Sequence, residues 1–170
     1  MTERQQCEKI YKAAFGTAQG FDELLFDYYF DDVDVLEYHG SVVSMLFKIP
    51  CEIELGEIKK TAYYLYAVAT DEQYRGRGYM SELIKRCCDD SDALYFLKPA
   101  TTRLEKFYER LGFKKLSATP MCQADINITV SEKHIKLSQM CKKIKDDYNL
   151  MFLGALPQNI KTVSFKDTLE

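Results

Sequence analysis

The chain of 170 residues contains no tryptophan and has two histidines and six cysteines. The histidines, His39 and His134, are far apart, and no two cysteines have Cys-x-x-Cys spacing. A zinc site therefore has no recognisable ligand pattern, and we expect no metal. We expect all six cysteines to be free thiols. They are Cys7, Cys51, Cys87, Cys88, Cys122 and Cys141.

Long apolar runs are also missing, because charged residues interrupt each of them before membrane-spanning length. The segment Met1–Gln6 lacks the apolar stretch of a signal peptide. The net charge is −3, and no basic face stands out. These absences predict a cytoplasmic protein that binds neither membranes nor nucleic acid.

What the chain does contain is enough apolar surface for a hydrophobic core, since 46% of the residues are hydrophobic. No internal repeat, low-complexity segment or linker divides it. We therefore predict that residues 1–170 form one domain.

Apolar spacing and turn residues predict alternating helices and strands. Helices are expected at about 3–15, 20–30, 79–89 and 101–111, the last capped by Thr101 or Thr102 and ending at Gly112. Strands are expected at about 33–38, 41–49, 61–70 and 93–97. His39-Gly40 should form a tight hairpin turn, Pro50 should end the second strand or lie at its edge, and residues 51–60 should form a connection. Beyond residue 118 the pattern is weaker, with strands near 124–130, 149–154 and 162–166 and a helix near 131–146.

One junction has the form of a phosphate-binding loop. The apolar strand 61–70 leads into Gln73, Arg75, Gly76, Arg77 and Gly78, and a helix follows. Glycines let the main chain approach an anion closely, and the first N–H groups of a helix have no internal partner. The two arginines add positive charge beside these groups.

Two segments together resemble the GNAT superfamily of N-acetyltransferases over about residues 1–118. Gln73-x-x-Gly76-x-Gly78 resembles the acyl-CoA pyrophosphate loop of that family, and Phe107–Phe113 resembles its second signature. The resemblance implies an α/β fold with a mixed, mostly antiparallel sheet flanked by helices. Two parallel central strands, 61–70 and 93–97, should splay apart around the pantetheine arm, and residues 119–170 should add further strands and a helix.

The resemblance implies acetyl-CoA as the co-substrate and gives a set of residues that would bind it. These are Val68, Ala69, Thr70, Gln73, Arg75, Gly76, Arg77, Gly78, Tyr79, Met80 and Thr101. Backbone amides at residues 68–70 would pair with pantetheine and polarise the thioester carbonyl. Tyr108 would be the catalytic acid that protonates the leaving thiolate, although it also falls on the apolar face that its helix should bury, together with Leu104, Phe107 and Leu111.

The sequence departs from the family pattern at two positions. Several members have asparagine where this chain has Thr101, and some have a glutamate general base where it has Ala62. No base is therefore assigned. A water chain, Glu37 or Glu57 remain open alternatives.

We predict transfer of acetyl from acetyl-CoA to a primary amine of a small molecule, peptide or protein, by direct attack in a ternary complex. The alternative is a non-catalytic acyl-CoA-binding or sensor module of the same fold. A domain that binds another nucleotide is a third reading, although no Walker lysine is present. The acidic run 22–37 either attracts a cationic amine or is a solvated face. The protein could be a monomer or a homodimer.

Overall fold

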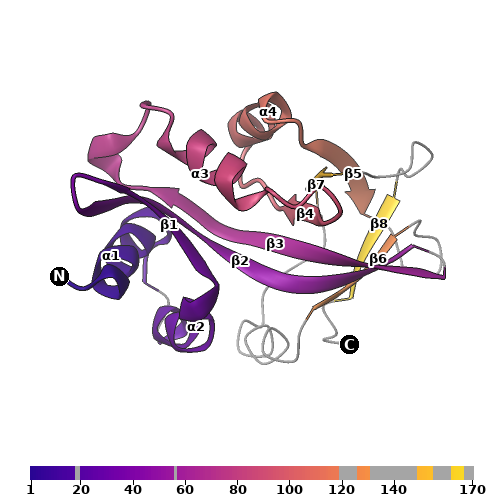
Figure 1. Ribbon diagram of the computed structural model, residues 1–170, viewed down its shortest axis with the longest axis horizontal. Coiled ribbons are helices and arrows are strands. Elements are labelled where there is room, and N and C mark those ends of the chain that lie inside the picture. The colour runs from indigo at the N-terminus through magenta and orange to yellow at the C-terminus, as the bar shows by residue number, and fades with distance from the viewer. Residues whose placement is uncertain (18–19, 56, 119–125, 131–148, 155–161, 167–170) are drawn as a thin grey trace. The chain divides into compact units, whose positions relative to one another are not determined.

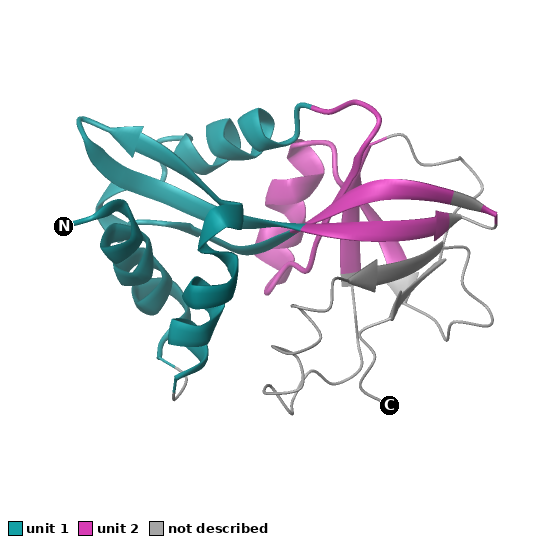
Figure 2. Cartoon of the chain, turned by 60° about the horizontal axis from the view of Figure 1, so that its bottom comes forward, with its two compact units in different colours: residues 1–49, 65–89 teal, residues 50–64, 90–170 magenta. Residues whose placement is uncertain are grey.

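The computed structural model describes residues 1–17, 20–55, 57–118, 126–130, 149–154 and 162–166 (Figure 1). The chain forms two compact units (Figure 2). Unit 1 contains Met1–Ile49 and Leu65–Asp89, and unit 2 contains Pro50–Tyr64 and Asp90–Glu170. The boundary crosses two long strands, β2 (Ser41–Leu55) and β3 (Ile58–Thr70), so each strand contributes to both units.

Unit 1 begins with two helices that bury apolar faces. In α1 (Glu3–Phe15), Thr2 and Gln5 form a capping box, and Cys7, Ile10 and Tyr11 are buried. In α2 (Phe21–Tyr29), Leu25, Phe26 and Tyr29 are buried. The Phe26 ring meets Phe47 of β2 edge to face at 5.2 Å between centroids. The helices at 3–15 and 20–30 are thus confirmed.

The rest of unit 1 consists of β1 (Val33–Tyr38), the first part of β2, the end of β3 and α3 (Tyr79–Cys87). A short 3₁₀ turn, η1 (Phe30–Asp32), leads into β1. β1 pairs antiparallel with β2, and the predicted hairpin turn is present. His39 and Gly40 both have positive φ, 50° and 74°, as a tight two-residue hairpin turn requires.

Unit 2 contains β4 (Leu94–Leu97), α4 (Thr102–Arg110), β5 (Lys114–Ala118), β6 (Ile126–Val130), β7 (Asn149–Leu153) and β8 (Thr162–Lys166). Its core includes Ile53, Leu94, Phe96, Leu116 and Phe152. Strands 124–130, 149–154 and 162–166 are confirmed with small shifts at their ends. The helix expected at 131–146 lies outside the described residues.

The strands follow the order β1-β2-β3-β4-β7-β5-β8-β6, and β2 also pairs with β6. Pairings β1–β2, β2–β6, β4–β7 and β5–β7 are antiparallel, whereas β3–β4, β5–β8 and β6–β8 are parallel. The mixed, mostly antiparallel sheet flanked by helices is therefore confirmed. β3 pairs with β4 from Ala62 to Tyr64. Divergence of the two strands beyond that point stays a prediction.

Two expectations about strands were wrong. Pro50 does not end β2, and residues 51–60 are largely strand, not connection, because β2 continues to Leu55 and β3 starts at Ile58. Pro50 lies between Phe47, the last residue paired with β1, and Cys51, the first paired with β6. Its missing N–H therefore costs neither of these ladders a hydrogen bond. β5 was not expected at all.

Among the described residues, no helix is both long and apolar enough to cross a bilayer. Cys7, Cys51, Cys87 and Cys88 are free thiols. The expectations for Cys122 and Cys141 lie outside the described residues.

Candidate functional site

The predicted phosphate loop joins β3 to α3 entirely within unit 1. After Thr70, Asp71 caps a 3₁₀ turn, η2 (Glu72–Tyr74), by accepting a hydrogen bond from the Gln73 N–H at 3.0 Å. The Arg75 Nε donates to the Thr70 carbonyl at 3.2 Å. These contacts fold the segment back on the end of β3, so the strand end and the loop form one local structure.

Gly76 and Gly78 are required by the backbone. Both have left-handed φ, 78° and 85°, which side-chain-bearing residues rarely adopt. A Cβ at either position would meet nothing within 4 Å. The space beside both glycines is therefore open, and a ligand can approach the main chain there.

The first turn of α3 lacks a side-chain cap. Gly78 is its N-cap residue and offers no side chain to the first N–H groups. The Glu82 N–H bonds the Gly78 carbonyl at 3.1 Å, which starts the regular ladder. The earlier amides are left for a ligand or water, and the helix dipole favours an anion there.

The end of β3 holds a feature that the sequence did not indicate. Ala67 has φ of 50° inside a strand, a left-handed conformation that is uncommon for alanine. Val68, Ala69 and Thr70, the predicted pantetheine-binding residues, follow it directly. Ala69 is buried, and the Thr70 hydroxyl shares a hydrogen bond with the Ser44 hydroxyl at 2.9 Å. No composition or spacing signal distinguishes Ala67 from neighbouring strand residues.

A shallow groove of about 430 Å³ continues from the loop along α3. Gly78, Ser81, Glu82, Lys85 and Arg86 line it. The Arg86 guanidinium donates to the Val35 carbonyl at 3.1 Å and is held there. Ser81 and Lys85 were not predicted as site residues. Their spacing of four along a helix that starts at the glycine loop is the signal that could have found them.

Tyr108 lies in unit 2 and is the buried residue of α4, with 5% of its surface exposed. Its ring packs edge to face on Phe113, with centroids 5.7 Å apart. Burial raises the pKa of its phenol to about 12. None of the residues that the structure describes hydrogen-bonds its hydroxyl. Leu104, expected on the same buried stripe, is instead 37% exposed.

Thr101 is the N-cap of α4, and its Oγ1 accepts a hydrogen bond from the Leu104 N–H at 3.3 Å. At the other end of the helix, Gly112 has φ of 94°, and a Cβ there would lie 3.3 Å from Leu153 Cδ1. Thr101 and Gly112 thus set the two ends of α4. The hydroxyl of Thr101 is already used as a cap, which limits what it offers a cofactor.

No general base emerges from the candidates. Ala62 is fully buried in the unit 2 core. Glu37 and Glu57 are exposed. Among the described residues, no three His, Cys, Asp or Glu side chains gather as metal ligands would.

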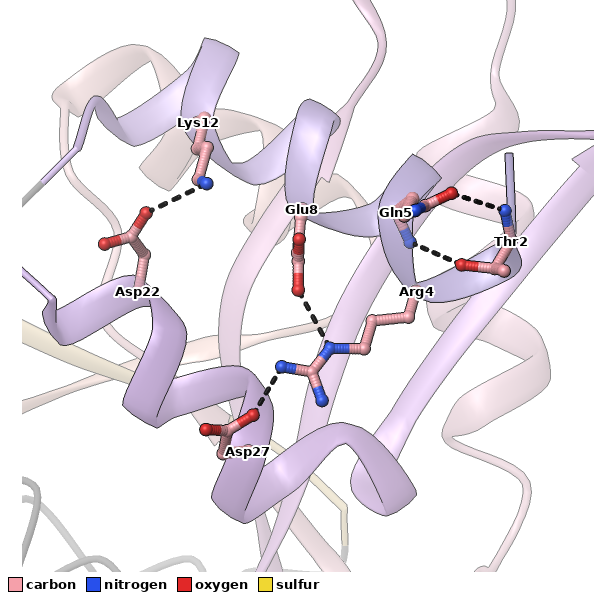
Figure 3. Close-up of polar contacts among 7 residues, drawn as sticks. All are labelled: Thr2, Arg4, Gln5, Glu8, Lys12, Asp22 and Asp27. Carbon is pink, nitrogen blue, oxygen red and sulfur yellow. Dashed lines mark hydrogen bonds and ion pairs between the residues drawn. The ribbon is translucent and has the colours of Figure 1, made fainter.

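Part of the acidic run at 22–37 is paired with cations of α1 (Figure 3). Asp22, which is 5% exposed, lies 3.5 Å from the Lys12 ammonium. Asp27 bonds the Arg4 guanidinium, which also bonds Glu8 at 2.8 Å. These two carboxylates join α2 to α1. If the run attracts a cationic acceptor, its other acidic residues provide that attraction.

A family model described as an acetyltransferase (GNAT) domain matches residues 1–116, which is most of the chain and includes both predicted motifs. No curated protein matches the sequence.

Several solved structures share the fold. A structure of histone acetyltransferase HPA2 and related acetyltransferase from Corynebacterium glutamicum has 16% identity and a TM-score of 0.58, over 92% of this chain and 93% of that one. Rv2747 from Mycobacterium tuberculosis, in complex with CoA, has 15% identity and a TM-score of 0.56, over 91% and 95%. At these identities the likeness concerns the fold alone.

A GCN5-related N-acetyltransferase from Anabaena variabilis has 23% identity and a TM-score of 0.57 over 66% of this chain. The match spans only 29% of that structure, and 32% and 30% of similar proteins from Kribbella flavida and Enterococcus faecalis. The chain thus corresponds to about a third of those longer proteins.

Proposed function

Since the chain belongs to the GNAT family of acetyltransferases, we propose that it transfers an acetyl group from acetyl-CoA to a primary amine. The acceptor would be a small molecule, a peptide or a protein. The observation that carries the proposal is the loop between β3 and α3, which has two left-handed glycines and an uncapped helix start.

The donor set of this loop fits a pyrophosphate. Amides of residues 76–80 supply N–H donors, and the space above both glycines is open. Arg75 and Arg77 supply positive charge that offsets two phosphate charges. A pyrophosphate needs many donors and close main-chain approach, and this segment provides both.

Bound acetyl-CoA would supply a thioester, whose carbonyl carbon is attacked by an amine. The protein's part is to hold that carbonyl and to move protons. Backbone N–H groups at residues 68–70, directed by the left-handed Ala67, would bind the pantetheine amides and polarise the thioester carbonyl.

Tyr108 would donate the proton to the departing thiolate. Its support is the match to the second family signature, a phenol that keeps its proton at neutral pH, and a hydroxyl not used by any described residue. The base that removes a proton from the acceptor's ammonium group, so that the neutral amine can attack, is unassigned, and water can serve when the amine's own pKa is low.

A second candidate function is favoured by one observation. Ala62 is fully buried and apolar where some family members have a glutamate base. A protein without that base would suit binding or sensing of acyl-CoA without turnover.

Two measurements test these proposals. Calorimetry with CoA tests the site, using Gly78→Asp, which places a carboxylate where phosphate would bind. Gly20→Asp is a matched control, because Gly20 caps α2 with φ 81° and ψ −4°, and Gly78 caps α3 with φ 85° and ψ −3°. We expect only Gly78→Asp to abolish CoA binding, and equal affinities in both variants would refute the site.

A thiol-release screen of amines with acetyl-CoA then separates the two functions. An enzyme releases CoA with at least one amine class, and that class identifies the acceptor. Tight CoA binding with no release for small amines, peptide N-termini or lysine side chains would favour the sensor.

A further inference from the structure

Three tyrosine rings meet around the phosphate loop of unit 1. The ring centroid of Tyr38 lies 6.2 Å from that of Tyr74 and 5.5 Å from that of Tyr79, and the Tyr74 and Tyr79 centroids are 6.2 Å apart. We call Tyr38, Tyr74 and Tyr79 the tyrosine cluster. Each ring contacts the other two, so the cluster is a closed triangle.

The three rings come from three different places in the chain. Tyr74 ends η2 just before the glycine loop, and Tyr79 starts α3 just after it. Tyr38 is the last residue of β1, beside the turn at His39 and Gly40. That turn and the loop before α3 lie side by side (Figure 1). Tyr38 therefore ties both ends of the glycine loop to the β1–β2 hairpin.

The cluster also holds a cation of the loop. The Arg77 guanidinium carbon lies 5.4 Å from the centroid of the Tyr74 ring. Stacking of this kind restricts the direction of the guanidinium and leaves its N–H donors free at the edge. One side of the triangle thus orients a positive charge between the two glycines.

The cluster contributes little to the core of unit 1. Tyr38 is 40% exposed, and the structure shows no hydrogen bond from any of the three hydroxyls to a described residue. Packing between rings is therefore the interaction that matters. The tyrosine cluster lies at the surface and contacts both ends of a loop with two glycines. It is therefore better suited to ordering that loop than to stabilising the core.

We propose that Tyr38 is a positioning residue that fixes the phosphate loop in its binding conformation before the cofactor arrives. The proposal rests on the proposed function, because it concerns how the loop binds the CoA pyrophosphate. Glycines lose more backbone freedom than other residues when they are ordered. A loop that is already ordered loses less entropy on binding, which raises affinity.

Amide hydrogen exchange without CoA tests the loop directly. In Tyr38→Ala, two of the three ring contacts are lost, and we expect exchange at residues 76–80 to accelerate about tenfold. Tyr38→Phe keeps the ring and should exchange like the parent. Tyr28→Ala is the matched control, because Tyr28 is 39% exposed and lies on α2 away from the loop.

Calorimetry on the same proteins connects the loop to binding. CoA affinity should fall about tenfold in Tyr38→Ala and stay within about twofold in Tyr38→Phe and Tyr28→Ala. If Tyr38→Ala lowers the melting temperature, Tyr38→Leu keeps the apolar bulk, removes the ring, and should weaken CoA binding in the same way.

Four outcomes would overturn the proposal. Unchanged loop exchange in Tyr38→Ala shows that the ring does not order the loop. A loss in Tyr38→Phe equal to that in Tyr38→Ala shows that the hydroxyl acts instead. Parent protein that does not bind CoA refutes the proposed function and this proposal together, whereas CoA binding equal in parent and Tyr38→Ala refutes this proposal alone.

Discussion

Burial determines the chemistry available to Tyr108. A charged phenolate would lose its hydration where Tyr108 is buried. This loss raises the pKa of the phenol to about 12. At neutral pH the side chain is therefore a neutral hydrogen-bond and proton donor. A catalytic acid needs that form at the start of the step.

Tyr108→Phe should lower kcat at least about tenfold, because it removes the proposed proton donor and keeps the ring. CoA affinity and melting temperature should change little, since the ring contact with Phe113 remains. Phe107→Leu, which changes a neighbouring ring on the same helix, is the control. A Phe variant with parental kcat for its true acceptor would make Tyr108 a packing residue.

Ala67 shows how one backbone angle can be tested by mutation. A left-handed conformation costs a residue with a side chain about 1–2 kcal/mol, and glycine is largely free of that cost. Glycine in an ordinary strand is less stable than alanine by about 0.5–1 kcal/mol. Ala67→Gly should therefore leave the free energy of unfolding unchanged or raise it.

Ala69→Gly is the matched variant for that measurement, because Ala69 is also buried, at 5% exposure against 9% for Ala67, and its φ is not positive. It should lower the free energy of unfolding in urea titrations. Equal losses in the two glycine variants would mean that Ala67 carries no conformational strain.

At the level of elements, the two ends of α4 are set by residues that the sequence identified. Thr101 was one of two candidate caps, and the structure selects it over Thr102 because its Oγ1 accepts from the Leu104 N–H. Gly112 ends the helix with a left-handed φ, as expected. These features were predictable because capping depends on a few neighbouring residues.

Thr101→Ala should lower the free energy of unfolding by about 1 kcal/mol through loss of the cap, and Thr102→Ala should not. Thr101→Asn keeps a capping oxygen and introduces asparagine, the residue that several members of the family have at this position. It should preserve stability, and it should tighten CoA binding if that position contacts pantetheine. Chemical denaturation and calorimetry on the three variants provide both readouts.

Strand ends were harder to predict than helix ends, and the reason is visible at Pro50. Proline usually ends a strand, but here it falls between two ladders, one with β1 and one with β6. Whether its missing N–H matters depends on a partner strand more than 70 residues away in sequence, at Ile126–Val130. β5 was missed for a similar reason, since Lys114 and Lys115 start a strand whose pairing with β7 is remote.

At the scale of the whole chain, the glycine loop and the second signature were recognisable because each is local. Their place in two different units was not, since contacts between distant segments define the units. The tyrosine cluster shows the same limit. Tyr74 and Tyr79 are neighbours of the loop in sequence, but Tyr38 joins them only through the fold.

The cysteines allow a test that involves both units. Burial raises the pKa of the Cys7, Cys51 and Cys88 thiols to about 12, and that of Cys87 is raised as well. Thiolates, not thiols, react with alkylating agents. Folded protein at pH 7.5 should therefore be labelled by iodoacetamide at no more than two of its six cysteines, whereas unfolded, unreduced protein should be labelled at all six.

The same pKa shifts predict how stability depends on pH. Because the folded state binds these protons more tightly, their contribution to stability is complete below the unfolded pKa of about 9 and is lost as pH rises toward 12. Tyr108 adds a contribution that is lost between about pH 10 and pH 12.

The free energy of unfolding, measured by urea titration, should fall steadily above pH 9. Cys7→Ala should reduce that slope, whereas Leu104→Ala, at an exposed position without a titratable group, should not change it. A flat profile from pH 8 to 10.5 would show that the folded thiols titrate like free ones and that burial does not protect them.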